Sequence, residues 1–156
     1  MPTPDFVLEL RKKIGHDLMW SPGVAGVVIN KAGEVLLGRR ADNGEWTTIT
    51  GMLDPGEHPV DGLLREIEEE TAVQARVERL IEVSTTDVVT FANGDRSQFL
   101  TLAFRCAYVG GQAMVNDDES ADVAWFAPED LPPMRPAHTR RVAVALGKEP
   151  LPDYLR

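Results

Sequence analysis

The sequence is poor in several features that would point to particular classes of protein. Its 156 residues include a single cysteine, Cys106, which excludes an internal disulfide and a cluster of thiolate metal ligands. Cys106 lies in an apolar run, so we expect a buried small hydrophobic side chain. No stretch reaches the roughly 20 apolar residues of a membrane-spanning helix, and we expect no contact with a membrane. The N-terminal residues lack the basic and then apolar pattern of a signal peptide, which favours a cytoplasmic protein.

Basic residues are also scarce. The chain has 16 Lys and Arg against 25 Asp and Glu, which gives a formal net charge of −9 at pH 7. A protein that binds the phosphate backbone of DNA or RNA needs a basic face, so we expect no polymeric nucleic acid as a partner. Small phosphorylated molecules stay possible, because a bound metal ion can supply local positive charge.

The pattern along the chain is typical of the mixed α/β class. The length predicts a single domain over residues 1–156. We expect a first helix over about 5–15, with Phe6, Leu10 and Ile14 on one face, and then a hairpin whose strands cover 24–29 and 35–37. Further strands are expected over 46–49, 74–91, 99–109 and 123–126, and further helices after Pro59 and over 139–146.

The most informative stretch runs from Gly51 to Val73. It opens as a loop with Gly and Pro and continues as an acidic helix in which Glu66, Glu69 and Glu70 share one face. Like charges at this spacing repel by roughly 0.2–0.5 kcal/mol per pair, and a hard divalent cation would remove that cost. The run alone is compatible with a solvated acidic face or with a metal site.

The residues around the acidic run resemble the Nudix box, whose pattern is G-x5-E-x7-R-E-U-x-E-E-x-G-U with U aliphatic. The matching positions are Gly51, Glu57, Arg65, Glu66, Ile67, Glu69, Glu70 and Val73. Ala72 departs from the pattern, which has glycine there. Ile49-Thr50 also departs from the Pro-Gly that many members carry before the box glycine. The segments LLGRR, DNGEW and DDESADVAWFAPEDLP are similar to the family as well, so the resemblance spans most of the chain.

This resemblance implies a Nudix-like α/β/α sandwich with a mixed β-sheet. It also implies that Glu66, Glu69 and Glu70 bind one to three Mg²⁺ or Mn²⁺ ions, with the carbonyl of Gly51 as a further oxygen ligand. Glu57 would be an outer ligand or a residue that orients the helix.

Arg65 is expected to hold Glu57 or the loop backbone by forked hydrogen bonds. The alternative is an i,i+4 surface pair with Glu69. If Ala72 keeps the left-handed conformation of the family glycine, the strain costs roughly 1 kcal/mol, which leaves the metal ligands in place.

Candidate residues outside the box are weaker. Glu119 is the best candidate for a general base or an extra metal ligand, with Asp117 and Asp118 behind it; a solvated acidic loop is the alternative. Arg39 or Arg40 should contact a substrate phosphate, because one of two neighbouring strand residues faces the site. Trp46 could stack on a base, although such aromatic residues often belong to the core.

The function implied is divalent-metal-dependent hydrolysis of a small nucleoside diphosphate derivative, either ADP-ribose-like or a nucleoside triphosphate. Glu69, Glu70, Glu119 and Arg65 are the expected catalytic residues. A catalytically silent Nudix-fold sensor of a nucleotide or sugar phosphate is the alternative, and a homodimer is the expected assembly.

Overall fold

The apolar segment that follows residue 18 forms the centre of a mixed sheet. In the computed structural model, which describes residues 3–151, strand β1 (Met19–Ile29) pairs in parallel with β7 (Arg96–Gly110) along its whole length. The strand order β3-β2-β1-β7-β5 is completed by β4, β6 and β8, which pair with β1, β7 and β2, and these other pairings are antiparallel. The remaining bounds are β2 (Val35–Arg40), β3 (Trp46–Thr47), β4 (Ile49–Met52), β5 (Gln74–Thr85), β6 (Val89–Thr90) and β8 (Ser120–Phe126).

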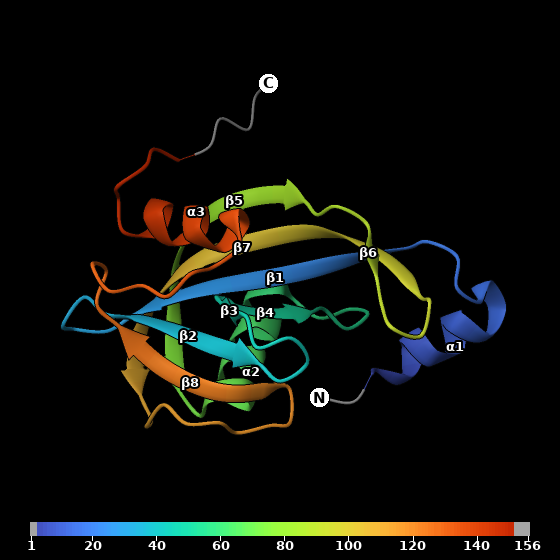
Figure 1. Ribbon diagram of the computed structural model, residues 1–156, viewed down its shortest axis with the longest axis horizontal. Helices are drawn as coiled ribbons and strands as arrows, with labels where there is room; N and C mark the ends of the chain where they lie inside the picture. The colour runs from blue at the N-terminus through green and yellow to red at the C-terminus, as the bar shows by residue number, and fades with distance from the viewer. Residues whose placement is uncertain (1–2, 152–156) are drawn as a thin grey trace.

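Helices cover both faces of this sheet. Helix α2 (Pro59–Thr71) lies on one face and α3 (Pro136–Ala145) on the other, while α1 (Asp5–Ile14) lies at one end (Figure 1). This arrangement confirms the expected α/β fold class. No helix between residues 3 and 151 is long and apolar enough to cross a membrane.

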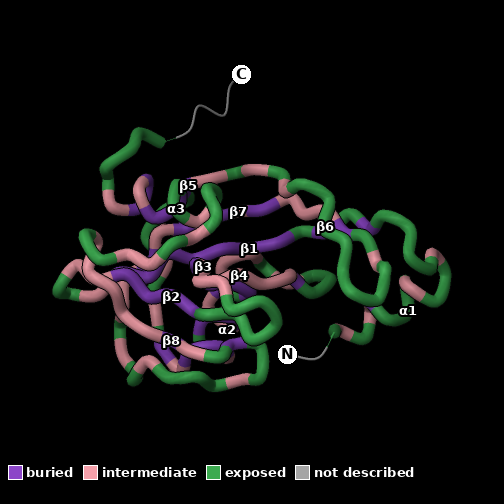
Figure 2. The backbone as a smooth tube through the Cα atoms, viewed as in Figure 1, coloured by how far each residue is buried: buried purple, intermediate pink, exposed green. Residues whose placement is uncertain are grey.

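The side chains of β2 alternate between two cores, one on each face of the sheet. Leu36 belongs to the core that contains Leu63 and Ile67 of α2. Val35 and Leu37 belong to the other core, which contains Val142 and Ala145 of α3. Figure 2 shows long buried stretches of the backbone in β1, β2 and part of β7. Even-numbered residues of β2 therefore face α2, and odd-numbered residues face α3.

Helix α1 is present as expected, but it packs through a different residue from the predicted face. Val7 is buried and Leu10 is 42 % exposed. The helix is fastened by Arg11, which donates to the carbonyl of Arg96 at 2.8 Å and to Ser97 Oγ at 3.1 Å at the start of β7. Polar anchoring therefore sets the orientation of α1 rather than its apolar periodicity.

A histidine joins α3 to the segment between β3 and β4. Nδ1 of His138 lies 2.9 Å from Thr48 Oγ1 and accepts from the Thr48 backbone N–H at 3.3 Å. Burial, together with Arg141 and Arg135 nearby, lowers the pKa of His138 to about 4. The imidazole is therefore neutral at physiological pH, and His138 has a packing role.

Both ends of α2 follow local rules. His58 is the N-cap, and its Nδ1 accepts from the Val60 N–H at 3.3 Å, while Pro59 occupies the first helical position. At the other end Ala72 adopts φ 57°, ψ 13°, the left-handed conformation that the family glycine would adopt at no steric cost. Among residues 3–151, Ala72 is the only non-glycine residue with positive φ.

The substitution Ala72→Gly should therefore stabilise the protein by about 0.5–1 kcal/mol, because it removes the clash of the Ala72 Cβ in the left-handed region. Urea unfolding measures the change. Ala143→Gly, within the right-handed α3, is the matched control and should destabilise by about 0.5–1 kcal/mol. A loss of stability in Ala72→Gly equal to that of the control would contradict the assigned strain.

Candidate active site

The three glutamates predicted to share a face lie in the C-terminal half of α2. Glu66 is 3 % exposed and Glu70 is 8 % exposed. The side chain of Glu69 is 40 % exposed, so it lies at the rim of the cluster. Two carboxylates withdrawn from water and a third beside them are not a solvated acidic face, and this burial favours an ion-binding arrangement.

Gly51 of β4 is the residue against which Glu66 packs. A Cβ at position 51 would lie 2.2 Å from Glu66 Cγ, a separation that real side chains do not reach. The Glu66 side chain therefore lies against the Gly51 backbone in space that any larger residue would fill. β4 holds Gly51 there by pairing with β1, where Gly51 lies opposite Val24.

Arg65 joins the loop before α2 to the carboxylates on the helix. Its Nε and Nη2 donate to the two oxygens of Glu57 at 2.8 and 3.1 Å. Its Nη1 donates to Glu66 Oε1 at 2.9 Å and to Glu69 Oε2 at 3.1 Å. The forked bond to Glu57 and the i,i+4 pair with Glu69 were alternatives in the sequence, and the structure contains both.

Glu57 also accepts a hydrogen bond from the backbone of its own loop. Its Oε2 accepts from the Asp54 N–H at 3.0 Å, and hydrogen bonding to Arg65 lowers the pKa of this carboxyl below its usual range. Nη2 of Arg65 also approaches the carbonyl of Met52 at 3.4 Å. With both oxygens engaged in this way, Glu57 orients the loop and α2 relative to each other.

Burial and neighbouring charge make the helix carboxylates weak acids. Burial raises the pKa of Glu66 to about 7 against the opposing effect of Arg65. Burial, with the charges of Glu66, Glu119 and Asp117, raises the pKa of Glu70 to about 8. The negative form of both side chains thus has a high free energy, which a nearby cation would lower.

A pocket lies between α2 and the ends of β2 and β8. Its lining consists of Gly38, Arg40, Thr47, Thr50, Glu70, Glu119 and Ser120. Glu119 is exposed, and its charge contributes to the raised pKa values of Glu66 and Glu70. The structure therefore brings Glu119 to the acidic face of α2, although the two lie about 50 residues apart in the sequence.

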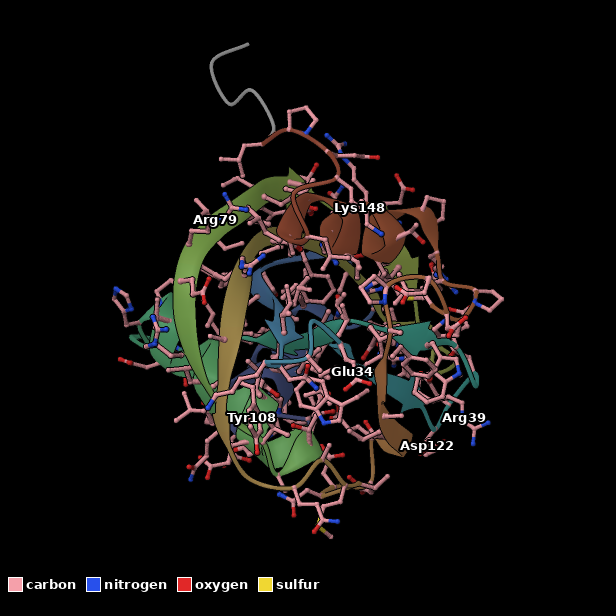
Figure 3. The ribbon with its side chains drawn as sticks, turned by 90° about the vertical axis from the view of Figure 1, so that its left-hand side faces the viewer. Glu34, Arg39, Arg79, Tyr108, Asp122 and Lys148 are labelled. Carbon is pink, nitrogen blue, oxygen red and sulfur yellow. The ribbon has the colours of Figure 1, made fainter. Side chains whose placement is uncertain are left out.

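The alternation of β2 separates the two neighbouring arginines. Arg40 lines the pocket on the α2 side, and its hydrogen bond to Asp42, with smaller effects of the Glu119 and Glu70 charges, raises its pKa. Arg39 lies on the α3 side, with its guanidinium carbon 5.9 Å from the centroid of the Trp46 ring. In Figure 3 Arg39 points outward from the edge of the molecule.

Trp46 lies with Arg39 rather than with the carboxylates. Its ring meets Phe126 edge to face at a centroid distance of 4.9 Å and packs against the α3-side core. The structure thus brings Arg40, Glu70 and Glu119 together and leaves Arg39 and Trp46 on the opposite face of the sheet.

The donor set fits a hard divalent cation. Carboxylate oxygens are the ligands that Mg²⁺ and Mn²⁺ prefer, and Glu66 and Glu70 are buried where only a cation or a proton lowers their free energy. As the side chains stand between residues 3 and 151, no three Asp, Glu, His or Cys side chains converge closely enough to hold a metal ion. Arg65 engages the Glu66 and Glu69 oxygens in this arrangement.

Sequence reasoning missed the pocket's small polar residues and one helix-end contact. Thr47, Thr50 and Ser120 line the pocket but carry no motif. Asn116 donates from Nδ2 to the carbonyl of Glu68 at 3.0 Å, and its N–H donates to the carbonyl of Glu70 at 3.2 Å. The only sequence hint for Asn116 was its place beside the acidic loop, which does not reveal a cap on the end of α2.

Comparisons with known proteins agree with this geometry. The family model described as "NUDIX domain" matches residues 19–145. A MutT-like protein of Streptomyces ambofaciens is 36 % identical over 111 residues, which cover 71 % of this chain and 66 % of that protein. An NAD-capped RNA hydrolase NudC of Pseudomonas putida is 34 % identical over 110 residues, which cover 69 % of this chain and 37 % of that protein.

The match to solved structures shows the fold. The crystal structure of a UDP-X diphosphatase superposes with a TM-score of 0.66 at 24 % identity and covers 94 % of this chain and 73 % of that chain. In contrast, the alignment with the two sequence relatives spans only 66 % and 37 % of their own lengths.

The contact between Gly51 and Glu66 predicts the result of a single added methyl group. Gly51→Ala should destabilise the protein by about 1–3 kcal/mol, because the new Cβ forces Glu66 out of its position. Denaturant unfolding measures this. Gly23→Ala is the matched control in the neighbouring strand, since its Cβ would meet Gly51 O at an ordinary 3.5 Å. Equal stabilities of the two variants would contradict the close packing of Glu66 on Gly51.

Proposed function

The chain belongs to the Nudix family, and on that premise we propose that it hydrolyses the diphosphate of a nucleoside diphosphate linked to another group, with a divalent metal ion. The observation that carries the proposal is the placement of two buried helix carboxylates opposite an acidic loop and an arginine. Glu66 and Glu70 supply hard oxygen ligands, and Glu119 and Arg40 lie across the same pocket.

The metal would be held by Glu66, Glu69 and Glu70, with the Gly51 carbonyl as a further candidate ligand. A bound Mg²⁺ or Mn²⁺ neutralises diphosphate charge and lowers the pKa of the attacking water. Arg65 keeps the Glu66 and Glu69 oxygens in place, and Glu57 holds Arg65 by two hydrogen bonds. These contacts limit the freedom of the Glu66 and Glu69 side chains, and the ion would take the place of Arg65 at the oxygens that Arg65 now occupies.

The reaction adds water to one phosphorus atom and breaks the bond from that phosphorus to the bridging oxygen. A carboxylate accepts the proton that water loses, and the candidates are Glu119, Glu69 and Glu70. Arg40 is the substrate-facing cation of the pocket and would bind a phosphate oxygen that does not react.

The relatives support a class of substrate but no single compound. NAD, named in the NudC relative, is itself a nucleoside diphosphate linked to a second nucleoside, and UDP-X diphosphatase names a compound of the same kind. The net charge of −9 opposes strong binding of the RNA chain itself. We therefore expect a small diphosphate compound as substrate, with ADP-ribose-like molecules and nucleoside triphosphates as the two main groups.

A substrate panel tests the proposal. The intact protein is incubated with Mg²⁺ or Mn²⁺ and ADP-ribose, NAD, UDP-sugars, nucleoside triphosphates, oxidised triphosphates or a short NAD-capped RNA, and products are separated by anion-exchange chromatography. We expect metal-dependent release of a nucleoside monophosphate from at least one compound. Glu70→Gln should lower kcat at least about 100-fold, because it removes a charged ligand without changing the shape of the side chain.

The matched control is Glu68→Gln, an exposed glutamate of the same helix, which should keep the activity. Equal turnover in Glu70→Gln and the wild type would contradict the assignment of Glu70 as a metal ligand. Absence of turnover on the whole panel, together with calorimetric binding of one of its compounds, would favour the catalytically silent sensor instead.

We further propose that two copies of the chain form a homodimer. The exposed apolar side chains Leu18, Trp20, Val88, Val89 and Phe91, which belong to or adjoin strands β1 and β6 on either side of β7, support this. Light scattering after size exclusion should give twice the mass of the chain, 17.2 kDa. Trp20→Ser should return the protein to the mass of a monomer, and a monomeric wild type would refute the proposal.

A further inference from the structure

Asp42 lies two residues beyond Arg40, in the turn from β2 to β3, and outside the Nudix box. Both of its oxygens accept hydrogen bonds from Arg40, from Nε to Oδ1 at 2.8 Å and from Nη2 to Oδ2 at 2.6 Å. Two parallel bonds of this kind fix the plane of the guanidinium as well as its position. Hydrogen bonding to Arg40 lowers the pKa of Asp42, so the pair is ionic at neutral pH.

The turn that carries Asp42 is held from two sides. It is closed on itself, because the Arg40 N–H donates to Glu45 O at 2.9 Å and the Gly44 N–H donates to Arg40 O at 3.0 Å. It is also fastened to the loop before β8, because the Ala41 N–H donates to Glu119 O at 2.8 Å. Asp42 therefore starts from a fixed backbone, and its carboxylate is a stable support for the Arg40 side chain.

Two opposite effects of Asp42 on an anionic ligand are possible. Its charge partly neutralises Arg40, which would weaken the attraction of a phosphate. It also prevents Arg40 from pairing with Glu70 or Glu119, whose charges act on the same guanidinium. An arginine paired with those carboxylates would occupy the oxygens that the metal and the water need. The forked geometry favours the second effect. Asp42 accepts from only two of the five guanidinium N–H groups, so the other three can still donate to a phosphate.

We propose that Asp42 is a positioning residue that holds the Arg40 guanidinium at the rim of the pocket, where its remaining N–H groups meet the diphosphate of the substrate. This inference rests on the proposed function. It assigns the charge recognition of the substrate to a pair of residues outside the Nudix box. Arg40 binds the phosphate, and Asp42 acts through Arg40.

Steady-state kinetics on a substrate found in the panel is the first test. Asp42→Ala should raise KM about tenfold and change kcat less than about twofold, because the loss concerns binding of a phosphate oxygen that does not react. Asp87→Ala removes the same charge from an exposed loop between β5 and β6 and should leave KM unchanged. A lower KM in Asp42→Ala would show that neutralisation dominates and would overturn the proposal.

A double-mutant cycle distinguishes a positioning role from a direct one. If Asp42 acts only through Arg40, then Asp42→Ala adds nothing to KM once Arg40→Ala is present. An equal rise of KM in the presence and absence of Arg40 would overturn the proposal.

Two readouts do not need turnover. In the wild type, the side-chain Nε–H of Arg40 should give an exchange-protected NMR signal, identified by its absence in Arg40→Ala and lost in Asp42→Ala. Inorganic pyrophosphate with Mg²⁺, titrated by calorimetry, should bind about tenfold more weakly to Asp42→Ala than to the wild type.

These measurements separate the inference from the proposed function. Weaker pyrophosphate binding in Asp42→Ala, with no turnover on the panel, would support the Asp42–Arg40 pair while the hydrolase proposal fails. Conversely, Asp42→Ala could turn over the substrate normally, with unchanged KM, pyrophosphate binding and Arg40 signal. That result would reject the positioning role of Asp42 while the hydrolase proposal stands.

Discussion

The hydrogen bonds of a single guanidinium organise the acidic half of the site. Arg65 contacts Glu57 on the loop and Glu66 and Glu69 on the helix, with all four N–O distances between 2.8 and 3.1 Å. Without this cation, carboxylates on one helical face would repel each other and rotate into solvent. The same contacts join the loop to α2, so the geometry of the ligands and the path of the chain before the helix depend on one side chain. Part of the Arg65 side chain is exposed (26 %), which leaves the bonds accessible to an arriving ion.

The sheet decides which residues can join that cluster. Alternation along β2 sends Leu36 and Arg40 to the α2 side and sends Leu37 and Arg39 to the α3 side. The antiparallel pairing of β2 with β8 then places the start of β8 beside the end of β2, with Ser120 opposite Arg40. Residues remote in sequence therefore reach the helix glutamates through strand pairing alone. The pocket is a consequence of register, and a shift by one residue would remove Arg40 from it.

The sequence predicted the parts of the site that a short segment encodes and left open the parts that depend on pairing between distant segments. The shared helical face of Glu66, Glu69 and Glu70, the start of α2 at Pro59 and the buried Cys106 follow from local spacing and composition, and the structure contains each of these features. The choice between Arg39 and Arg40 could not be made, because it depends on which face of β2 meets α2. The predicted face of α1 is only partly buried, because Phe6 and Ile14 are half-buried while Leu10 is exposed, and the hydrogen bonds of Arg11 fix the helix. The metal-binding assignment of the glutamates stays a prediction.

The net negative charge of the protein opposes the binding of an anionic diphosphate unless positive charge lies close to the site. An anionic diphosphate approaching a chain with a formal charge of −9 meets repulsion at long range, which salt screens beyond about 10 Å. At short range, the pocket lining includes two carboxylates and only one cation, Arg40. On the proposed function, a divalent ion held by the glutamates would supply the additional positive charge that a phosphate needs there, and its oxygen preference suits carboxylate ligands. On the proposed function, the burial that raises the pKa of Glu66 and Glu70 would couple the two binding events, because a divalent ion that stabilises the ionised glutamates also attracts the diphosphate.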